Sequence, residues 1–183
     1  MVRGACGSAR SRAAGRCRGK MTAMAAKDLC PCRSTRPYKA CCEPYHRGAR
    51  EAPDAEALMR SRFAAFAKKE ADYLWRTLHP DHEDRQHDRA EVLRALKSSA
   101  STLRYAGLAI LDRREPDEAG IAQVLFLARL YEGSNERSFV ELSDFAHDGE
   151  GWRYLRGRLI PAGAIPGDAM RLTIEAFEAL PRK

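Results

Sequence analysis

Between residues 53 and 100 the hydrophobic positions recur every three or four residues, the period of an α-helix. The first predicted helix begins after Asp54, a residue type that caps helix N-termini, and Pro80 ends a second, shorter one. A third begins at Asp88, where Glu91 completes the signature of a capping box. The apolar stripe of the first helix consists of Leu58, Met59, Phe63, Phe66 and Ala67.

After Ser101 the hydrophobic period becomes two, which predicts strands. The expected strands are 103–111, 121–131, 139–145 and 152–156, with a turn at 148–151 between the last two. In the second strand one face collects Ala122, Val124, Phe126, Ala128 and Leu130. Helices followed by a run of neighbouring strands indicate an α+β fold with helices on one face of an antiparallel sheet. We expect a last helix over 170–180.

Charge divides the chain at residue 28. The net charge is +7, and residues 1–27 contain seven basic residues and no acidic one, so the remaining 25 basic residues balance 25 acidic residues. A neutral body lacks the general basic field that phosphate-backbone binding exploits. We interpret 1–27 as a disordered basic leader or as sequence upstream of the true start. A transit peptide and a nucleic-acid-binding arm remain alternatives.

These breaks in pattern suggest four segments: the leader 1–27, a cysteine module at 28–48, a main domain at 49–160 and a C-terminal extension with one helix at 161–183. No apolar run approaches the ~20 residues that cross a bilayer. The leader also lacks the apolar segment of a secretory signal. We therefore expect a soluble, cytoplasmic protein.

Four of the six cysteines lie within thirteen residues, as a Cys-x-Cys pair and an adjacent pair eight residues later. Clustered thiols in a reducing compartment favour metal binding over disulfides. Four thiolates suit a tetrahedral zinc ion and leave no open coordination position, so the predicted site is structural. An iron–sulfur cluster and ordinary buried thiols are the alternatives. The predicted ligands are Cys30, Cys32, Cys41 and Cys42.

The segment from Cys30 to Cys42 resembles the SEC-C motif, a zinc-binding segment named for the tail of the SecA translocase ATPase. The residues that follow, roughly to 160, resemble the YchJ family of uncharacterised bacterial proteins. The matching runs are 52–54, 58–63, 72–74, 77–80 and 107–108. Further matches stand at Phe126, Ala128, Arg129, Glu141, Ser143, Phe145, Trp152, Tyr154 and Gly157. The resemblance implies an NTF2-like domain, in which helices and a curved antiparallel sheet form a cone.

The chain departs from this family pattern at several positions. The usual Gly-Ser-Gly of the motif is Arg33-Ser34-Thr35, which strains the knuckle if either end needs a positive φ. Leu125 stands where the family implies a glutamate, and Leu142 and Asp144 where it implies arginines. A second cysteine motif that the family often carries near the C-terminus is replaced by the predicted helix. We therefore expect a polar pocket of the family to be partly absent.

Two residues are weak catalytic candidates. His79 could be a general acid or base, although capping or packing is the ordinary role of such a histidine. Glu141 could pair with Arg129 across neighbouring strands. Arg60 and Arg62 could hold an anion, although salt bridges between a helix and a loop are commoner.

Three functions follow from these observations. The leading hypothesis is a non-catalytic zinc-binding protein, an adaptor for a protein partner through the cysteine module. The alternative is a small-molecule-binding protein or enzyme that uses the cone with His79 and Glu141. Nucleic-acid binding through the leader and the basic residues of the module ranks last.

Overall fold

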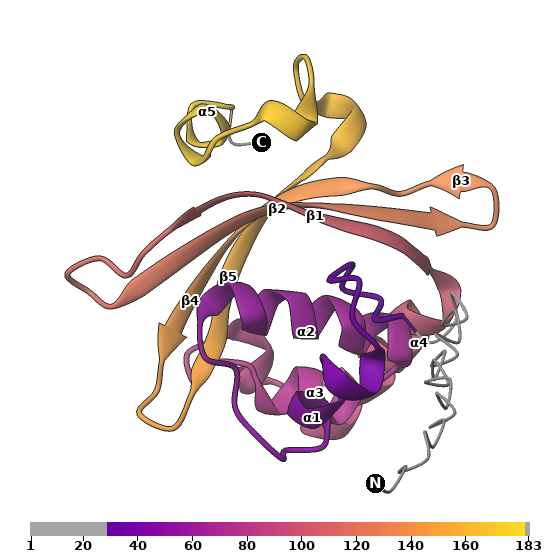
Figure 1. Ribbon diagram of the computed structural model, residues 1–183, viewed down its shortest axis with the longest axis vertical. Coiled ribbons are helices and arrows are strands. Elements are labelled where there is room, and N and C mark those ends of the chain that lie inside the picture. Colours follow the sequence, from indigo (N-terminus) through magenta and orange to yellow (C-terminus); the bar gives the residue numbers. More distant parts are fainter. Residues whose placement is uncertain (1–28, 182–183) are drawn as a thin grey trace, which may run out of the picture.

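The computed structural model describes residues 29–181, so the predicted leader at 1–27 lies outside the described residues. The expected α+β fold is confirmed (Figure 1). The helices are α1 (Glu43–His46), α2 (Ala55–Lys68), α3 (Ala71–Arg76), α4 (Arg89–Thr102) and α5 (Ile174–Glu178). The strands are β1 (Arg104–Arg114), β2 (Ile121–Glu132), β3 (Asn135–Glu136), β4 (Phe139–His147) and β5 (Trp152–Pro161).

The strands form one antiparallel sheet in the order β1-β2-β4-β5, with the short β3 beside β2. The sheet curves over α2, and the C-terminal segment lies on its other side (Figure 1). Strand β5 runs five residues beyond its predicted end, because residues 157–161 continue to pair with β4. The result is a helix layer, a curved sheet and a small outer layer.

The capping residues read from the sequence begin the helices. Asp54 accepts a hydrogen bond from the backbone N–H of Ala57 at 2.7 Å, and Asp88 accepts one from that of Glu91 at 3.1 Å. No helix within residues 29–181 combines the length and apolar character needed to cross a membrane.

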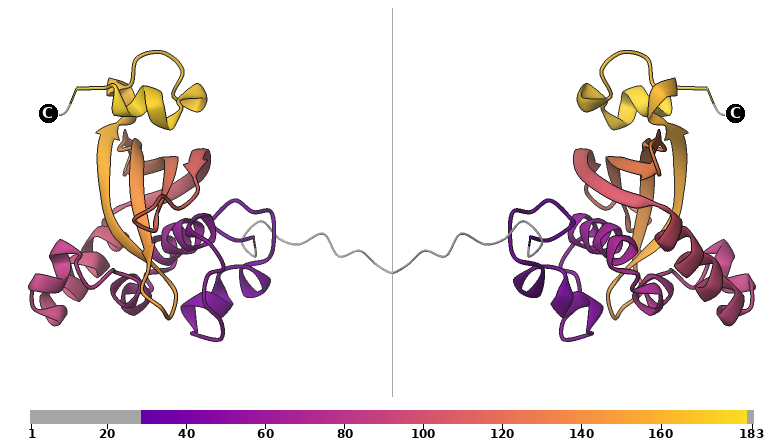
Figure 2. Two further views of the ribbon diagram at one scale, coloured as in Figure 1. Left: turned by 90° about the vertical axis from the view of Figure 1, so that its left-hand side faces the viewer. Right: turned by 90° about the vertical axis from the view of Figure 1, so that its right-hand side faces the viewer.

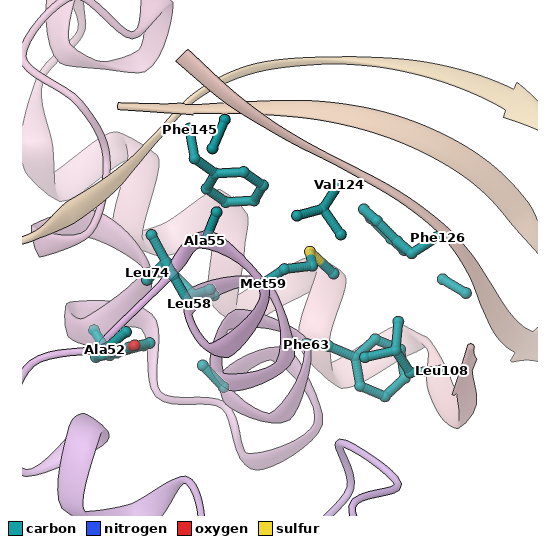
Figure 3. Close-up of a cluster of buried hydrophobic side chains, with 14 of the residues drawn as sticks. Ala52, Ala55, Leu58, Met59, Phe63, Leu74, Leu108, Val124, Phe126 and Phe145 are labelled. Atoms are coloured by element: carbon teal, nitrogen blue, oxygen red, sulfur yellow. The ribbon is translucent and has the colours of Figure 1, made fainter. Parts of the chain in front are cut away.

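The inner face of the sheet and α2 enclose the main core. Phe145, Val124 and Phe126 point from the sheet toward Ala55 and Met59 of α2 (Figure 3). The five β2 residues assigned to one face from the sequence all belong to this core, so that assignment is confirmed. The alternate β2 residues Leu125 and Leu127 are also buried, but in a second core.

That second core lies on the outer face of the sheet, under the C-terminal segment. Ile165, Ile174 and Phe177 cover Leu125 and Leu142. The predicted helix over 170–180 is wrong in extent. A 3-10 turn at Ala169–Arg171 precedes α5, which begins only after Thr173 because its hydroxyl caps the backbone N–H of Ala176.

The outer core also corrects our interpretation of the missing polar pocket. Leu125 and Leu142 lie on the face opposite α2, so these positions do not line the interior between sheet and helices. The leucines complement the apolar C-terminal segment. The polar groups of the interior are different residues.

Candidate metal centre

The cysteine module folds as two short turns that project beside α2 (Figure 2). In the first turn Leu29 bridges Pro37, and the backbone N–H of Cys30 donates to the carbonyl of Arg36 at 2.8 Å. The second turn is a 3-10 helix at Tyr38–Ala40 that runs into α1. Each turn contributes two cysteines, so the eight-residue spacing returns the chain to its starting point.

The four cysteine sulfurs face one another, with all four atoms within 4.8 Å of each other. The Cys32 and Cys41 sulfurs are 3.6 Å apart, and those of Cys41 and Cys42 are 3.9 Å apart. A tetrahedral site with metal–sulfur bonds of about 2.3 Å has sulfur–sulfur edges of about 3.8 Å. All four cysteines are buried and free of disulfides. The cluster can therefore hold one metal ion.

The protonation of the thiols also favours a cation. Hydrogen bonding with the Cys30 thiol lowers the pKa of Cys32, whereas the same contact raises the pKa of Cys30 to about 12. Hydrogen bonds to Cys30 and Cys32 raise the pKa of Cys42, and burial adds to the increase. Thiols must lose their protons to bind a metal ion. A divalent ion would replace the remaining protons, so metal affinity should rise with pH.

The cluster rests directly on α2. Arg60 donates from Nη1 to the carbonyl of Cys32 at 3.2 Å, while its Nε pairs with Glu56 at 2.7 Å. Ala64 is fully buried against the sulfurs. Arg60 therefore makes a salt bridge within α2 in place of the expected helix-to-loop salt bridge, and its contact with Cys32 ties the cysteine module to the helix.

The turn that carries the family departure is strained. Arg33 has φ of 64° and Thr35 has φ of 62°, in the left-handed region that favours glycine. The expected strain is therefore present at both positions. Arg33 compensates in part, because its guanidinium donates to the carbonyl of Ala106 at the start of the sheet.

A buried histidine that the sequence analysis missed connects the module to α2. His46 donates from Nε2 to the carbonyl of Ser61 at 2.9 Å, and its Nδ1 accepts from the hydroxyl of Tyr38 at 2.8 Å. Burial lowers the pKa of His46, which favours this neutral form. The sequence indicates this role only through the position of His46, which follows Cys42 by four residues, or about one helical turn.

The two weak catalytic candidates lie in different settings. His79 accepts a hydrogen bond at Nδ1 from the backbone N–H of Asp81 at 3.2 Å, which is a capping contact. Glu141 and Arg129 lie on opposite faces of the sheet, so their proposed pairing is wrong. Glu141 instead bonds to Tyr154 and Ser143 on the inner face.

Comparison with known proteins agrees with this geometry. Residues 54–157 match the family model of the YchJ middle NTF2-like domain, and residues 27–44 match that of the SEC-C motif. The first match spans more than half of the chain. This chain belongs to the YchJ family.

Two solved structures resemble this YchJ-family chain. One is the solution structure of a SEC-C motif containing protein from Rhodopseudomonas palustris, with 30% identity over 72% of this chain and 98% of that chain and a TM-score of 0.61. The other is the crystal structure of a SEC-C motif containing protein from Psychrobacter arcticus, with 26% identity over 70% of this chain and 80% of that chain and a TM-score of 0.61. The segment that covers the outer face lies beyond the YchJ match.

Proposed function

We propose that this YchJ-family chain binds one structural zinc ion through Cys30, Cys32, Cys41 and Cys42, and that it acts as a non-catalytic binding protein. The observation that carries the proposal is the group of four buried sulfurs within 4.8 Å of one another. Zinc favours tetrahedral thiolate coordination. Four protein ligands leave no position at which a metal could activate water.

The packing of the module supports a structural role. Its buried hydrophobic cluster consists of the four cysteines and Ala64, with Tyr38 packed against them. So small a core cannot order the module alone, whereas structural zinc contributes on the order of 10 kcal/mol. The ion would then hold both turns against α2.

Metal analysis of the reduced, full-length protein tests this proposal. We expect one zinc per chain, and the double variant Cys41→Ser, Cys42→Ser should lose the metal and melt at lower temperature. Cys17→Ser, which removes a cysteine outside the motif, is the matched control and should change neither. A wild-type protein without zinc, or a double variant with unchanged zinc and melting, would refute the proposal. Iron and acid-labile sulfide would instead identify a cluster.

We further propose that the module is the surface that contacts a protein partner. Residues 29–50 carry five basic residues, all exposed, and one acidic residue that is half-buried. Residues 51–183 carry 20 basic and 23 acidic residues, so the positive charge is concentrated in the module. This positive surface complements a partner with an acidic face. The basic residues are Arg33, Arg36, Lys39, Arg47 and Arg50.

Charge reversal separates this role from nucleic-acid binding. The variant Arg36→Glu, Lys39→Glu should lose a partner that is crosslinked to the wild-type protein in its native cells. Arg94→Glu, Lys97→Glu on α4 makes the same charge change elsewhere and should retain it. Retention of the partner by the first variant, or its loss on nuclease treatment, would show that the proposal is wrong.

A further inference from the structure

Polar side chains from α2, β4 and β5 meet on the inner face of the sheet. Glu141 accepts hydrogen bonds at Oε1 from Ser143 at 2.6 Å and from the Tyr154 hydroxyl at 3.0 Å. The guanidinium of Arg62 lies 4.7 Å from the centre of the Tyr154 ring. Two groups of opposite charge therefore flank one aromatic side chain in the interior.

The backbone is shaped around the carboxylate. Gly157 pairs with Ser143 across the sheet, and a Cβ at this position would collide with the Glu141 carboxylate and the Tyr154 hydroxyl. Only glycine leaves the space that these two groups occupy. Gly157 is therefore part of the site.

Both charged groups have hydrogen-bonding capacity that the described residues leave unused. Arg62 is only 7% exposed, yet its hydrogen bonds all come from Nη1, to the carbonyl of Leu74 at 2.8 Å and the hydroxyl of Thr77 at 2.6 Å. Oε2 of Glu141 has no partner within residues 29–181. Within residues 29–181, Nε of Arg85 is the only side-chain nitrogen or oxygen that is fully buried from solvent and has no hydrogen-bond partner. The free atoms of Arg62 and Glu141 therefore face space that water can reach.

A cavity lies on the side of Glu141 where its neighbours Leu159 and Phe139 are found, although Glu141 and Arg62 do not line it. Leu159 is the cross-strand neighbour of Glu141 on the inner face, and it is 51% exposed. Phe139 lies two residues before Glu141 on the same face. This cavity of about 790 Å³ has Leu159, Phe139, Leu130 and Leu103 in its apolar wall, and Glu136, Arg137 and Ser138 add polar groups to its lining.

We propose that this interior site binds an α-amino acid with an apolar side chain. The ligand carboxylate would accept from Arg62, its ammonium would donate to Oε2 of Glu141, and its side chain would lie along Phe139 and Leu159. A zwitterion is complementary because it pairs both unpaired charges and brings no net charge into the interior.

The energetics of the two groups are consistent with such a ligand. Burial lowers the pKa of Arg62 and raises the pKa of Glu141, so the interior disfavours both charges. Direct contacts from a ligand would add to the limited hydration that burial leaves to each group. This inference extends the small-molecule alternative and does not depend on the zinc proposal.

Calorimetric titration of the full-length protein with L-leucine and L-phenylalanine tests the inference, with zinc content measured on the same sample. We expect saturable binding at millimolar concentrations or below. N-acetyl-L-leucine and L-leucinamide each remove one ligand charge, and each should bind about tenfold more weakly or worse. These analogues leave the protein unchanged, so the comparison stands even if an interior variant fails to fold.

Glu141→Gln provides the protein side of the test. It keeps the shape of the side chain and removes the charge, and it should weaken L-leucine binding about tenfold. Asp144→Asn, three residues along β4 and on the outer face, makes the same chemical change and should leave binding unaltered. Absent binding, equal binding of L-leucine and its blocked analogues, or unchanged affinity in folded Glu141→Gln would each overturn the inference.

Discussion

The substitution Thr35→Gly should strengthen the metal centre. Thr35 has φ of 62°, and a left-handed conformation costs an L-residue about 1–2 kcal/mol, with β-branched residues at the upper end. The added freedom of glycine in the unfolded chain offsets about 0.5–1 kcal/mol. The lost hydroxyl donates only to the neighbouring carbonyl of Ser34 at an exposed position, so its contribution is small. The net gain is about 1 kcal/mol.

Competition with a chelator measures this gain as metal affinity. Folding of the module and metal binding are coupled, so about 1 kcal/mol corresponds to roughly fivefold tighter binding. Arg33→Gly relieves similar strain but loses the hydrogen bond to Ala106, so its affinity should change little. Lys39→Gly lies in the 3-10 helix without a positive φ and should weaken binding. If Thr35→Gly weakened binding as Lys39→Gly does, the strain argument would be refuted.

Three further predictions concern the metal, the outer core and pH. Removal of the metal with a chelator should raise the rate of amide hydrogen exchange in residues 30–46 and leave β2 and β4 protected. The reason is that the four cysteines form the core of the module and take no part in the cores of the sheet. An equal loss of protection in all of these segments would contradict this prediction. Phe177→Ala should cost about 3–5 kcal/mol in urea unfolding, since Phe177 is fully buried, whereas Met170→Ala at an exposed site should cost less than about 0.5 kcal/mol. Burial lowers the pKa of His46 below 6.5, so the unfolded chain binds the proton more readily and stability should fall as pH drops below about 6.5. His46→Gln should flatten that dependence in unfolding experiments between about pH 5 and 7, and an unchanged slope would exclude His46 as its source.

The departures from the family pattern have two different structural meanings. Arg33 and Thr35 replace the two glycines of the motif and occupy turn positions with positive φ, so they are strained. Leu125 and Leu142 belong to a core that exists only because the C-terminal segment packs over the outer face. The sequence alone does not show which kind of departure each residue represents. A leucine in a strand gives the same pattern whether its side chain lies on the inner or the outer face of the sheet.

The sequence alone determined the features of this protein that depend on residues close together in the chain. The cysteine spacing, the helix caps at Asp54 and Asp88, and the alternation of β2 depend on neighbours within about one turn or one strand, so their physical basis is local. The burial of β2 on both faces was not predicted, because it depends on residues 165–177 returning to the sheet.

The polar interior was decided by tertiary structure. Arg62 is far from Glu141 and Tyr154 in the chain, and the sequence pattern marks each of the three only as an ordinary helix or strand residue. Their meeting requires the curvature of the sheet, the register that places Gly157 opposite Ser143, and the packing of α2 against the inner face. Charge and hydrogen-bonding capacity belong to single residues, whereas the absence of a partner for them is a property of the folded arrangement.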